Sequence, residues 1–519
     1  MSQAYLRLGE YQQALDCCKK SLKINEKVLG SCHVAVALSC NNMIEICLQF
    51  GEYQQALEYF EKALEISKMV FVEDAIMATL YANGGGVCMG LGDWQQSLEY
   101  YEKALEIAKK VYPKEHNVTL NIYEGMCFLY DKLKEYDKAL EYYKILLEIE
   151  ESLVYEKHKS LSDFFAQIED NYLITTFAKR LEKSYSSLAS IYRKLDEDHN
   201  AVEYYKKALE IRKLLLGEEH EDVTELCDDI GYIYLGLNKG HDAVEYFKKA
   251  LKIRKLLLGE EHEDVMTTCN GLGMAYYTVC EYQRSLECFE NVLKIRKRIL
   301  GESHIRTVES YGFIAFAYEG LGDYHKVLEW EKKALEIRME IDAENQESVA
   351  SSYDLIGEAY QGLREYQKAL EYYEKALEIR MSVLGEEHDD TVCVYSKIGF
   401  AYEGLGEYHQ ALDCFKKTLE IRLKVLGENH MSTSNSYKNM ASVYEKLGDC
   451  QKSLEYYEKA LEIRKVVLGE DALEVSEIYN KMNEVRKKIG KDVSCQNASD
   501  IGLLQKWLSC IRDCFRRKS

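Results

Sequence analysis

Histidines recur at one position of a repeating pattern in this sequence, and a row of histidines could hold a metal ion. Eight of the twelve lie in the linker between predicted helices: His33, His116, His158, His220, His262, His304, His388 and His430. The ligands of one zinc ion must all lie about 2 Å from it. Residues one repeat apart fall on successive helix pairs, roughly 10 Å apart, and no His-x-x-x-His pair occurs. The pattern therefore argues against a metal site and favours a role in helix initiation or linker packing.

No other group of residues resembles a catalytic site. Three consecutive glycines, Gly84 to Gly86, could suggest a phosphate-binding loop, but the pattern Gly-x-x-x-x-Gly-Lys-Ser/Thr does not occur. Inside a helix each glycine costs about 1 kcal/mol relative to alanine, so we expect a locally weak third repeat, or a bend. A nucleophile elbow, a catalytic triad and a dinucleotide fingerprint are also absent. We expect no enzyme activity, no cofactor, no metal and no small-molecule substrate.

An internal repeat sets the elements of this chain. The string LEYYEKALEIR occurs at residues 370–380 and again at 454–464. The small residue before this string and its variants occurs eleven times, as Ala14, Ala56, Ser97, Ala139, Ala201, Ala243, Ser285, Val327, Ala369, Ala411 and Ser453. The spacing is 41 or 42 residues except for one interval of 62 between Ala139 and Ala201. This indicates eleven units with one insertion.

Each unit contains two amphipathic helices. In the second helix of one unit, Ala369, Leu370, Tyr373, Ala376 and Leu377 recur at a spacing that places them on one face. The first helix repeats the string IGEAYQGL and its variants. One such hairpin cannot bury both of its apolar faces, so neighbouring units must stack into a solenoid held by nearest-neighbour contacts.

These residues resemble the tetratricopeptide repeat (TPR) family. That family's pattern of small and aromatic residues is followed by Gly399, Tyr402, Gly406, Tyr408, Ala411, Phe415 and Leu419, with Thr418 where the last alanine is usual. The 42-residue length and the ALEIR…LGEEH linker look most like the kinesin light chain and nephrocystin-3 branch. The resemblance implies an all-α, right-handed superhelical solenoid of about eleven TPR-type helix pairs with a C-terminal capping helix.

Departures from the period divide the chain into six segments. Residues 1–158 hold repeats 1–4, the first of them truncated because the sequence begins inside a first helix. Residues 159–182 form a non-repeat helical insertion, which either extends one helix or protrudes as a short helical pair, and which acts as a spacer or as a docking element. Residues 183–472 hold repeats 5–11. A capping helix at 473–490, a linker at 491–500 and a basic amphipathic tail at 501–519 complete the chain.

Composition narrows the class of partner. The net charge of −21 repels polyanions, so we do not expect a nucleic acid partner. The single proline, Pro113, fits an almost entirely helical chain. The 17 cysteines are scattered and form no paired Cys-x-x-Cys motifs, which indicates reduced thiols in a cytoplasmic protein.

The resemblance also implies a binding surface, because first-helix side chains of the family line a concave face that binds extended peptides. The matching positions are Glu225, Asp228, Tyr232, Tyr277, Glu309, Phe316, Glu319, Asp354, Glu358, Phe400, Glu403 and Glu445. Acidic and aromatic residues alternate among them, which suits extended segments carrying Lys or Arg with apolar anchors. We expect a non-enzymatic scaffold or adaptor that binds other proteins through this groove. The alternative is that these are ordinary solvated positions of an acidic protein.

The last stretch, residues 501–519, carries a local net charge of +4 in an acidic chain. Leu504, Trp507, Leu508, Ile511 and Phe515 fall on one helical face, and Cys510 and Cys514 lie four residues apart. Such a helix could lie on an anionic membrane, with palmitoylated cysteines, as in a membrane-tethered adaptor. It could equally fold back onto the acidic solenoid as an extra cap.

Overall fold

The computed structural model describes residues 11–70, 74–157, 172–341, 345–470 and 472–489. These residues form 22 helices and no strand, which confirms the predicted all-α class. The chain separates into two compact units, unit 1 at residues 1–279 and unit 2 at residues 280–519. The boundary falls in the turn between α14 and α15, and each unit is described by itself below.

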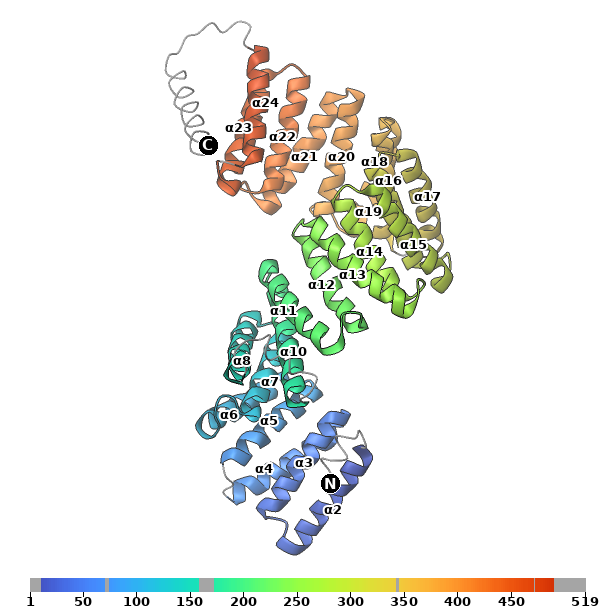
Figure 1. The fold of residues 1–519 in the computed structure, drawn as a ribbon. Coiled ribbons are helices and arrows are strands. Elements are labelled where there is room, and N and C mark those ends of the chain that lie inside the picture. Colours follow the sequence, from blue (N-terminus) through green and yellow to red (C-terminus); the bar gives the residue numbers. More distant parts are fainter. Residues whose placement is uncertain (1–10, 71–73, 158–171, 342–344, 471, 490–519) are drawn as a thin grey trace. The chain divides into compact units, whose positions relative to one another are not determined.

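Unit 1 is a succession of helices in which each helix packs on its neighbours in the sequence (Figure 1). Its helices are α2 (Tyr11–Leu29), α3 (Val34–Phe50), α4 (Tyr53–Met69), α5 (Asp74–Leu91), α6 (Trp94–Val111), α7 (Asn117–Lys132), α8 (Tyr136–Lys157), α10 (Tyr172–Lys194), α11 (Asp198–Leu216), α12 (Glu221–Gly236), α13 (Gly240–Leu258) and α14 (Glu263–Thr278).

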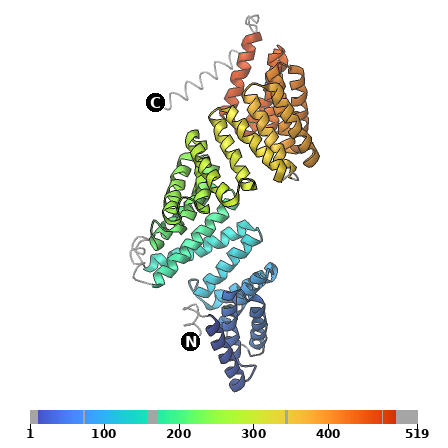
Figure 2. The same cartoon turned by 90° about the vertical axis from the view of Figure 1, so that its right-hand side faces the viewer.

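Unit 2 continues the same alternation of first and second helices, which Figure 2 shows from a second direction. Its helices are α15 (Tyr282–Leu300), α16 (Ile305–Gly320), α17 (Tyr324–Ile341), α18 (Gln346–Gly362), α19 (Tyr366–Val383), α20 (Asp389–Leu405), α21 (Tyr408–Leu426), α22 (Met431–Lys446), α23 (Cys450–Leu468) and α24 (Leu473–Ile489). Helix α24 lies where we expected the capping helix, and it packs on α23.

The expected insertion lengthens a helix in the part that the structure describes. Helix α10 has 23 residues and α8 has 22. Residues 172–182, which the sequence assigned to the insertion, form the first half of α10. Residues 159–171 lie outside the described residues, as do the start of the first repeat at 1–10, the linker at 491–500 and the tail at 501–519.

The recurring histidines start the first helices. In each case Nδ1 accepts a hydrogen bond from the backbone N–H two residues later, which satisfies one of the donors that a helix N-terminus leaves unpaired. The residues are His33, His116, His220, His262, His304, His388 and His430. His158 lies outside the described residues. Within the described ranges, no group of three or more His, Cys, Asp or Glu side chains is arranged to hold a metal ion.

In most repeats an aromatic side chain of the second helix is buried at one recurring position, and two of these rings, Tyr101 and Phe247, are seen to pack between glycines of two first helices. The Phe247 ring lies against Gly231 of its own repeat and Gly271 of the next, where an added Cβ would come within 2.8 Å and 2.5 Å of it. A ring stands at this position in nine repeats, as Phe60, Tyr101, Tyr143, Tyr205, Phe247, Phe289, Tyr373, Phe415 and Tyr457, and all nine are buried. Where the ring contacts both first helices, as Phe247 does, it joins a repeat to its successor.

The three consecutive glycines belong to the same packing scheme. Helix α5 runs unbroken through them. A Cβ on Gly84 would lie 2.4 Å from the Phe60 ring, and a Cβ on Gly85 would lie 2.9 Å from the Tyr101 ring. Helix propensity alone does not account for these glycines, because their missing side chains make room for two rings.

Replacing one of these rings tests the packing scheme. We expect Phe247→Ala to lower the free energy of unfolding of unit 1 by about 3–5 kcal/mol. The ring is fully buried, and the two first helices cannot both move in to fill the cavity that its removal leaves. Hydrogen exchange of peptides from α12 to α14 would measure this loss. Leu256→Ala is the matched control, because Leu256 is 66% exposed on the same helix. Unchanged protection of α12 and α14 in Phe247→Ala would contradict the scheme.

Candidate functional site

The structure places all twelve predicted groove residues on first helices. Glu225, Asp228 and Tyr232 lie on α12 and Tyr277 on α14, in unit 1. The other eight lie in unit 2, on α16 (Glu309, Phe316, Glu319), α18 (Asp354, Glu358), α20 (Phe400, Glu403) and α22 (Glu445). Unit 2 therefore carries most of the candidate surface.

Most of the predicted carboxylates already have a cationic partner. The ion pairs are Glu225–Arg212 at 3.8 Å, Asp228–Arg254, Glu309–Arg296 at 3.7 Å, Asp354–Arg380 at 3.2 Å, Glu358–Lys397 at 2.7 Å, Glu403–Lys446 at 2.9 Å and Glu445–Lys488 at 2.5 Å. In the part of the chain that the structure describes, Glu319 is the predicted carboxylate without an ion pair. The face thus offers less free negative charge than the composition suggests.

Two of the predicted acids are held inside the fold. Asp228 and Asp354 are 8% and 6% exposed, and each pairs with the buried arginine of the following second helix, Arg254 or Arg380. Burial raises the pKa of Asp228 to about 6, although Arg254 and the Thr268 hydroxyl act against this rise. These carboxylates neutralise buried guanidinium groups and have little surface to offer a partner.

Sequence reasoning missed the lysines that tie successive first helices together. Lys397 pairs with Asp354 at 2.5 Å, Lys446 pairs with Glu403, and Lys488 pairs with Glu445. In each pair the lysine follows the acid by 43 residues, one repeat plus one residue. That constant separation is the signal that could have identified them from the sequence.

The predicted aromatic residues differ in what they expose. The Tyr232 ring packs edge-on against Phe247 with a centroid distance of 5.0 Å, and Phe400 packs in the same way against Phe415 at 5.1 Å. Phe400 is still 38% exposed, whereas Tyr232, Tyr277 and Phe316 are half-buried. In unit 2, Phe316 and Phe400 therefore present apolar surface on the first-helix face.

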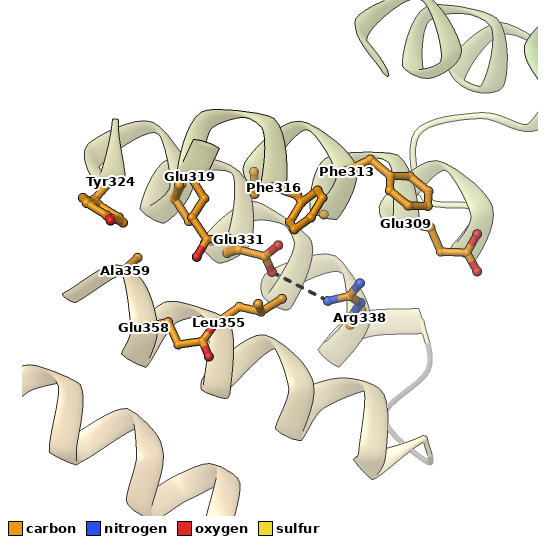
Figure 3. A pocket seen from close by; sticks show the side chains of 13 residues that line it. Glu309, Phe313, Phe316, Glu319, Tyr324, Glu331, Arg338, Leu355, Glu358 and Ala359 are labelled. Atoms are coloured by element: carbon orange, nitrogen blue, oxygen red, sulfur yellow. Dashed lines mark ion pairs between the residues drawn. The ribbon is translucent and has the colours of Figure 1, made fainter. Parts of the chain in front are cut away.

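Four predicted residues gather at one cavity of about 330 Å³ between α16, α17 and α18. They are Glu309, Phe316, Glu319 and Glu358, and Figure 3 shows them with the other lining side chains. The second helix α17 contributes Tyr324, Val327, Glu331 and Arg338, and Phe313, Leu355 and Ala359 are also in the lining. We call this space the Glu331 cavity.

Glu331 is the residue that sequence reasoning missed in this cavity. It is 1% exposed, its carboxylate lies 3.9 Å from Arg338, and neither of its oxygens has a hydrogen-bond partner. Burial raises its pKa to about 7; Arg338 opposes this rise and Glu358 adds to it. Its position in the repeat could have identified it from the sequence, because Glu331 stands where nine other repeats have the buried ring.

A second cavity, of about 530 Å³, lies near the end of unit 2. It is lined by Phe400 of α20, Lys438, Asn439 and Ser442 of α22, Tyr457 of α23, and Glu477, Ile478, Asn480 and Lys481 of α24. Burial lowers the pKa of Lys438, and Arg464 acts in the same direction. This cavity combines an apolar wall with groups of both charges.

The predicted membrane residues Trp507, Cys510 and Cys514 lie outside the described residues. Among the helices that the structure describes, none is long and apolar enough to cross a membrane.

Comparison with known proteins identifies the repeat. The sequence model of the tetratricopeptide repeat matches residues 1–69, 76–152, 180–256, 264–340, 348–424, 390–466 and 432–482. No curated protein matches the chain.

Solved structures similar to parts of this chain include a protein named as a kinesin light chain. A Podosopora anserina protein of nearly identical TPR-like repeats, which carries the kinesin light chain name, is 21% identical over 40% of this chain and 98% of its own, with a TM-score of 0.37. BtubC (BKLC) from P. vanneervenii is 21% identical over 48% of this chain and 92% of its own, with a TM-score of 0.38. The apo form of RapI is 20% identical over 55% of this chain and 98% of its own, with a TM-score of 0.42.

Glu331 should make the stability of unit 2 depend on pH. Its folded pKa of about 7 exceeds its ordinary value of 4.5, so the wild-type chain loses stability as pH rises from about 4.5 through 7. Glu331→Gln removes this loss, and we expect its advantage over the wild type to grow by about 3 kcal/mol between pH 4.5 and pH 8. Hydrogen exchange of α16 to α18 at both pH values measures it. An advantage that is the same at both pH values would contradict the assignment.

Proposed function

Because the chain belongs to the tetratricopeptide repeat family, whose members generally act as protein-interaction scaffolds, we propose that it is a non-enzymatic scaffold that binds extended segments of other proteins on the first-helix face of unit 2. The observation that carries this proposal is the presence of two cavities among the first helices of one unit, one lined by four predicted groove residues and the other by Phe400.

The apolar anchors of a bound segment would meet Phe316 and Phe400. Each ring lines one of the two cavities, and each belongs to a first helix, α16 or α20. Aromatic side chains have two side-chain torsions and a large contact area, so they supply apolar binding surface at low entropic cost. An extended segment can place alternate side chains against such anchors.

The charge preference of the site follows from the Glu331 cavity. Its lining contains four carboxylates, Glu309, Glu319, Glu331 and Glu358, and one cationic side chain, Arg338. Burial raises the pKa of Glu319, and nearby Glu358 raises it further, so an added positive charge there would relieve repulsion between the two acids. A basic side chain in the bound segment is therefore favoured over an acidic one, and the net charge of −21 would speed its approach.

Removing the two rings tests this function. We expect Phe316→Ala/Phe400→Ala to lose protein partners that the wild-type chain captures from a lysate of its source cells, with losses of about tenfold or more, as for truncated anchor residues. Quantitative mass spectrometry of the captured proteins measures it. Leu256→Ala/Leu257→Ala in unit 1 is the matched control, because it removes exposed apolar surface from a second helix.

Circular dichroism and hydrogen exchange must first show that both variants keep the fold. A partner list that survives the double ring variant unchanged would refute the proposed surface.

A further inference from the structure

The Glu331 cavity exists because two residues depart from the repeat. Glu331 replaces the buried ring of nine other repeats, and that ring would fill the space between the residues 16 before and 24 after it, Ala315 and Leu355. Both of these residues line the cavity. Gly312 stands where Asp228 and Asp354 stand in two other repeats, and a Cβ on it would lie 3.6 Å from Oε1 of Glu331. Both changes open the same space.

The carboxylate inside this space is not satisfied by the protein. Glu331 is 1% exposed and both of its oxygens lack a hydrogen-bond partner. A buried carboxylate in that state costs free energy that a ring at the same position would not. Figure 3 shows Glu319 and Glu358 beside Glu331, with Phe316 close to it and Glu309 further along α16.

A structural role as counterion to Arg338 does not account for Glu331. Where an aspartate neutralises the equivalent arginine, as for Asp354 with Arg380, it accepts a hydrogen bond at 3.2 Å. Glu331 instead lies 3.9 Å from Arg338, which donates to the Ser352 hydroxyl.

Another repeat shows that this arginine needs no carboxylate. Arg422 has no ion pair within the described ranges and donates to the Ser432 carbonyl at 3.1 Å and the Ser436 hydroxyl at 2.9 Å. Arg422 thus occupies the position equivalent to Arg338 with backbone and hydroxyl acceptors and no carboxylate, although Nε of both arginines lacks a hydrogen-bond partner. A carboxylate is not required at this position, so Glu331 can accept another partner.

We propose that the Glu331 cavity binds a single arginine side chain of the partner segment, whose guanidinium group donates to both carboxylate oxygens of Glu331. This deepens the proposed function and rests on it. Two free oxygens on one carboxylate match the two parallel N–H donors of a guanidinium group, whereas an ammonium group offers a point charge. The half-buried Phe316 and Tyr324 rings line the same space and can stack on the flat guanidinium.

The size and rim of the cavity fit this ligand. Its volume of about 330 Å³ lies within the range for ligand pockets, roughly 300–1,000 Å³, so one arginine side chain can enter it. The side chains of Glu309 and Glu358 at the rim are 51% and 35% exposed, but Arg296 and Lys397 already pair with them. In the described part of the chain this leaves Glu319 as the lining carboxylate without an ion pair, beside Glu331.

Binding should also depend on pH through the groups around the cavity. Glu331 must be ionised to accept the guanidinium, and its pKa of about 7 means that it is mostly protonated at pH 6. The other charged groups there are Glu309 and Glu319 on α16, Arg338 on α17 and Glu358 on α18, with Lys397 of α20 paired to Glu358. We therefore expect binding about tenfold weaker at pH 6 than at pH 8, in proportion to the ionised fraction.

The test uses the intact chain and a capped amino acid, N-acetyl-arginine methylamide, in a saturation-transfer NMR titration. We expect this probe to bind about tenfold or more tightly than its neutral citrulline counterpart, and more tightly than its lysine counterpart. Glu331→Gln should weaken arginine binding about tenfold or more at pH 8 and abolish the pH dependence. Glu331→Tyr, which restores the ring of the other repeats, should fold and should abolish binding by filling the cavity.

Glu309→Gln is the matched control, because it removes one rim carboxylate and leaves Glu331 in place; we expect a change below about threefold. Equal binding of the arginine and citrulline probes, or unchanged binding in Glu331→Gln, would overturn the proposal. If partner segments bind through Phe316 and Phe400 while the arginine probe does not bind, the arginine site is wrong and the scaffold function stands. If the probe binds at Glu331 and the double ring variant keeps every partner, the scaffold surface is wrong and the site stands.

Discussion

The contact on which the rest of each unit depends is the aromatic ring that packs between two successive first helices. Where the ring touches glycines on both, as Phe247 touches Gly231 and Gly271, it fixes the distance from one repeat to the next as well as the pairing inside a repeat. No glycine-lined space of this kind tolerates a Cβ without movement of the ring. The first helices can form a shared face only because this ring holds them side by side.

A second recurring feature, the contacts of arginine and lysine side chains, sets the charge on that face. Arginines of the second helices reach the following first helix and donate to its backbone, as Arg254 does to the Asp264 carbonyl and Arg464 does to the Glu474 carbonyl. Lysines one repeat further on neutralise the outer acids, as Lys446 does for Glu403. The protein is acidic overall, yet most first-helix carboxylates are satisfied within the fold. Specificity for a binding partner must therefore come from a position where the repeated pattern of this face is interrupted.

The sequence predicted what periodicity controls and missed what depends on single positions. The repeat itself, the two helices of each unit and the capping helix followed from spacing alone, because amphipathic faces recur with the period of 42 residues. The expectation of a locally weak third repeat or a bend at Gly84–Gly86 rested on helix propensity, which takes no account of the Phe60 and Tyr101 rings that occupy the space left by the missing side chains. The negative charge of the groove was predicted from its acidic residues alone, so the lysines that pair with them 43 residues later in the sequence were not counted.

The Glu331 cavity shows how a repeat protein can gain a specific site without leaving its fold. A repeated core position tolerates a departure such as Glu331, since the neighbouring repeats keep their rings and the stability of a repeat array is approximately a sum of local terms. The exception carries an energetic cost, because a buried carboxylate replaces apolar packing. Such a cost is offset when a cation enters, since the ligand supplies the hydrogen bonds that Glu331 lacks. The same feature that weakens this repeat when it is empty would therefore provide the free energy for selective binding.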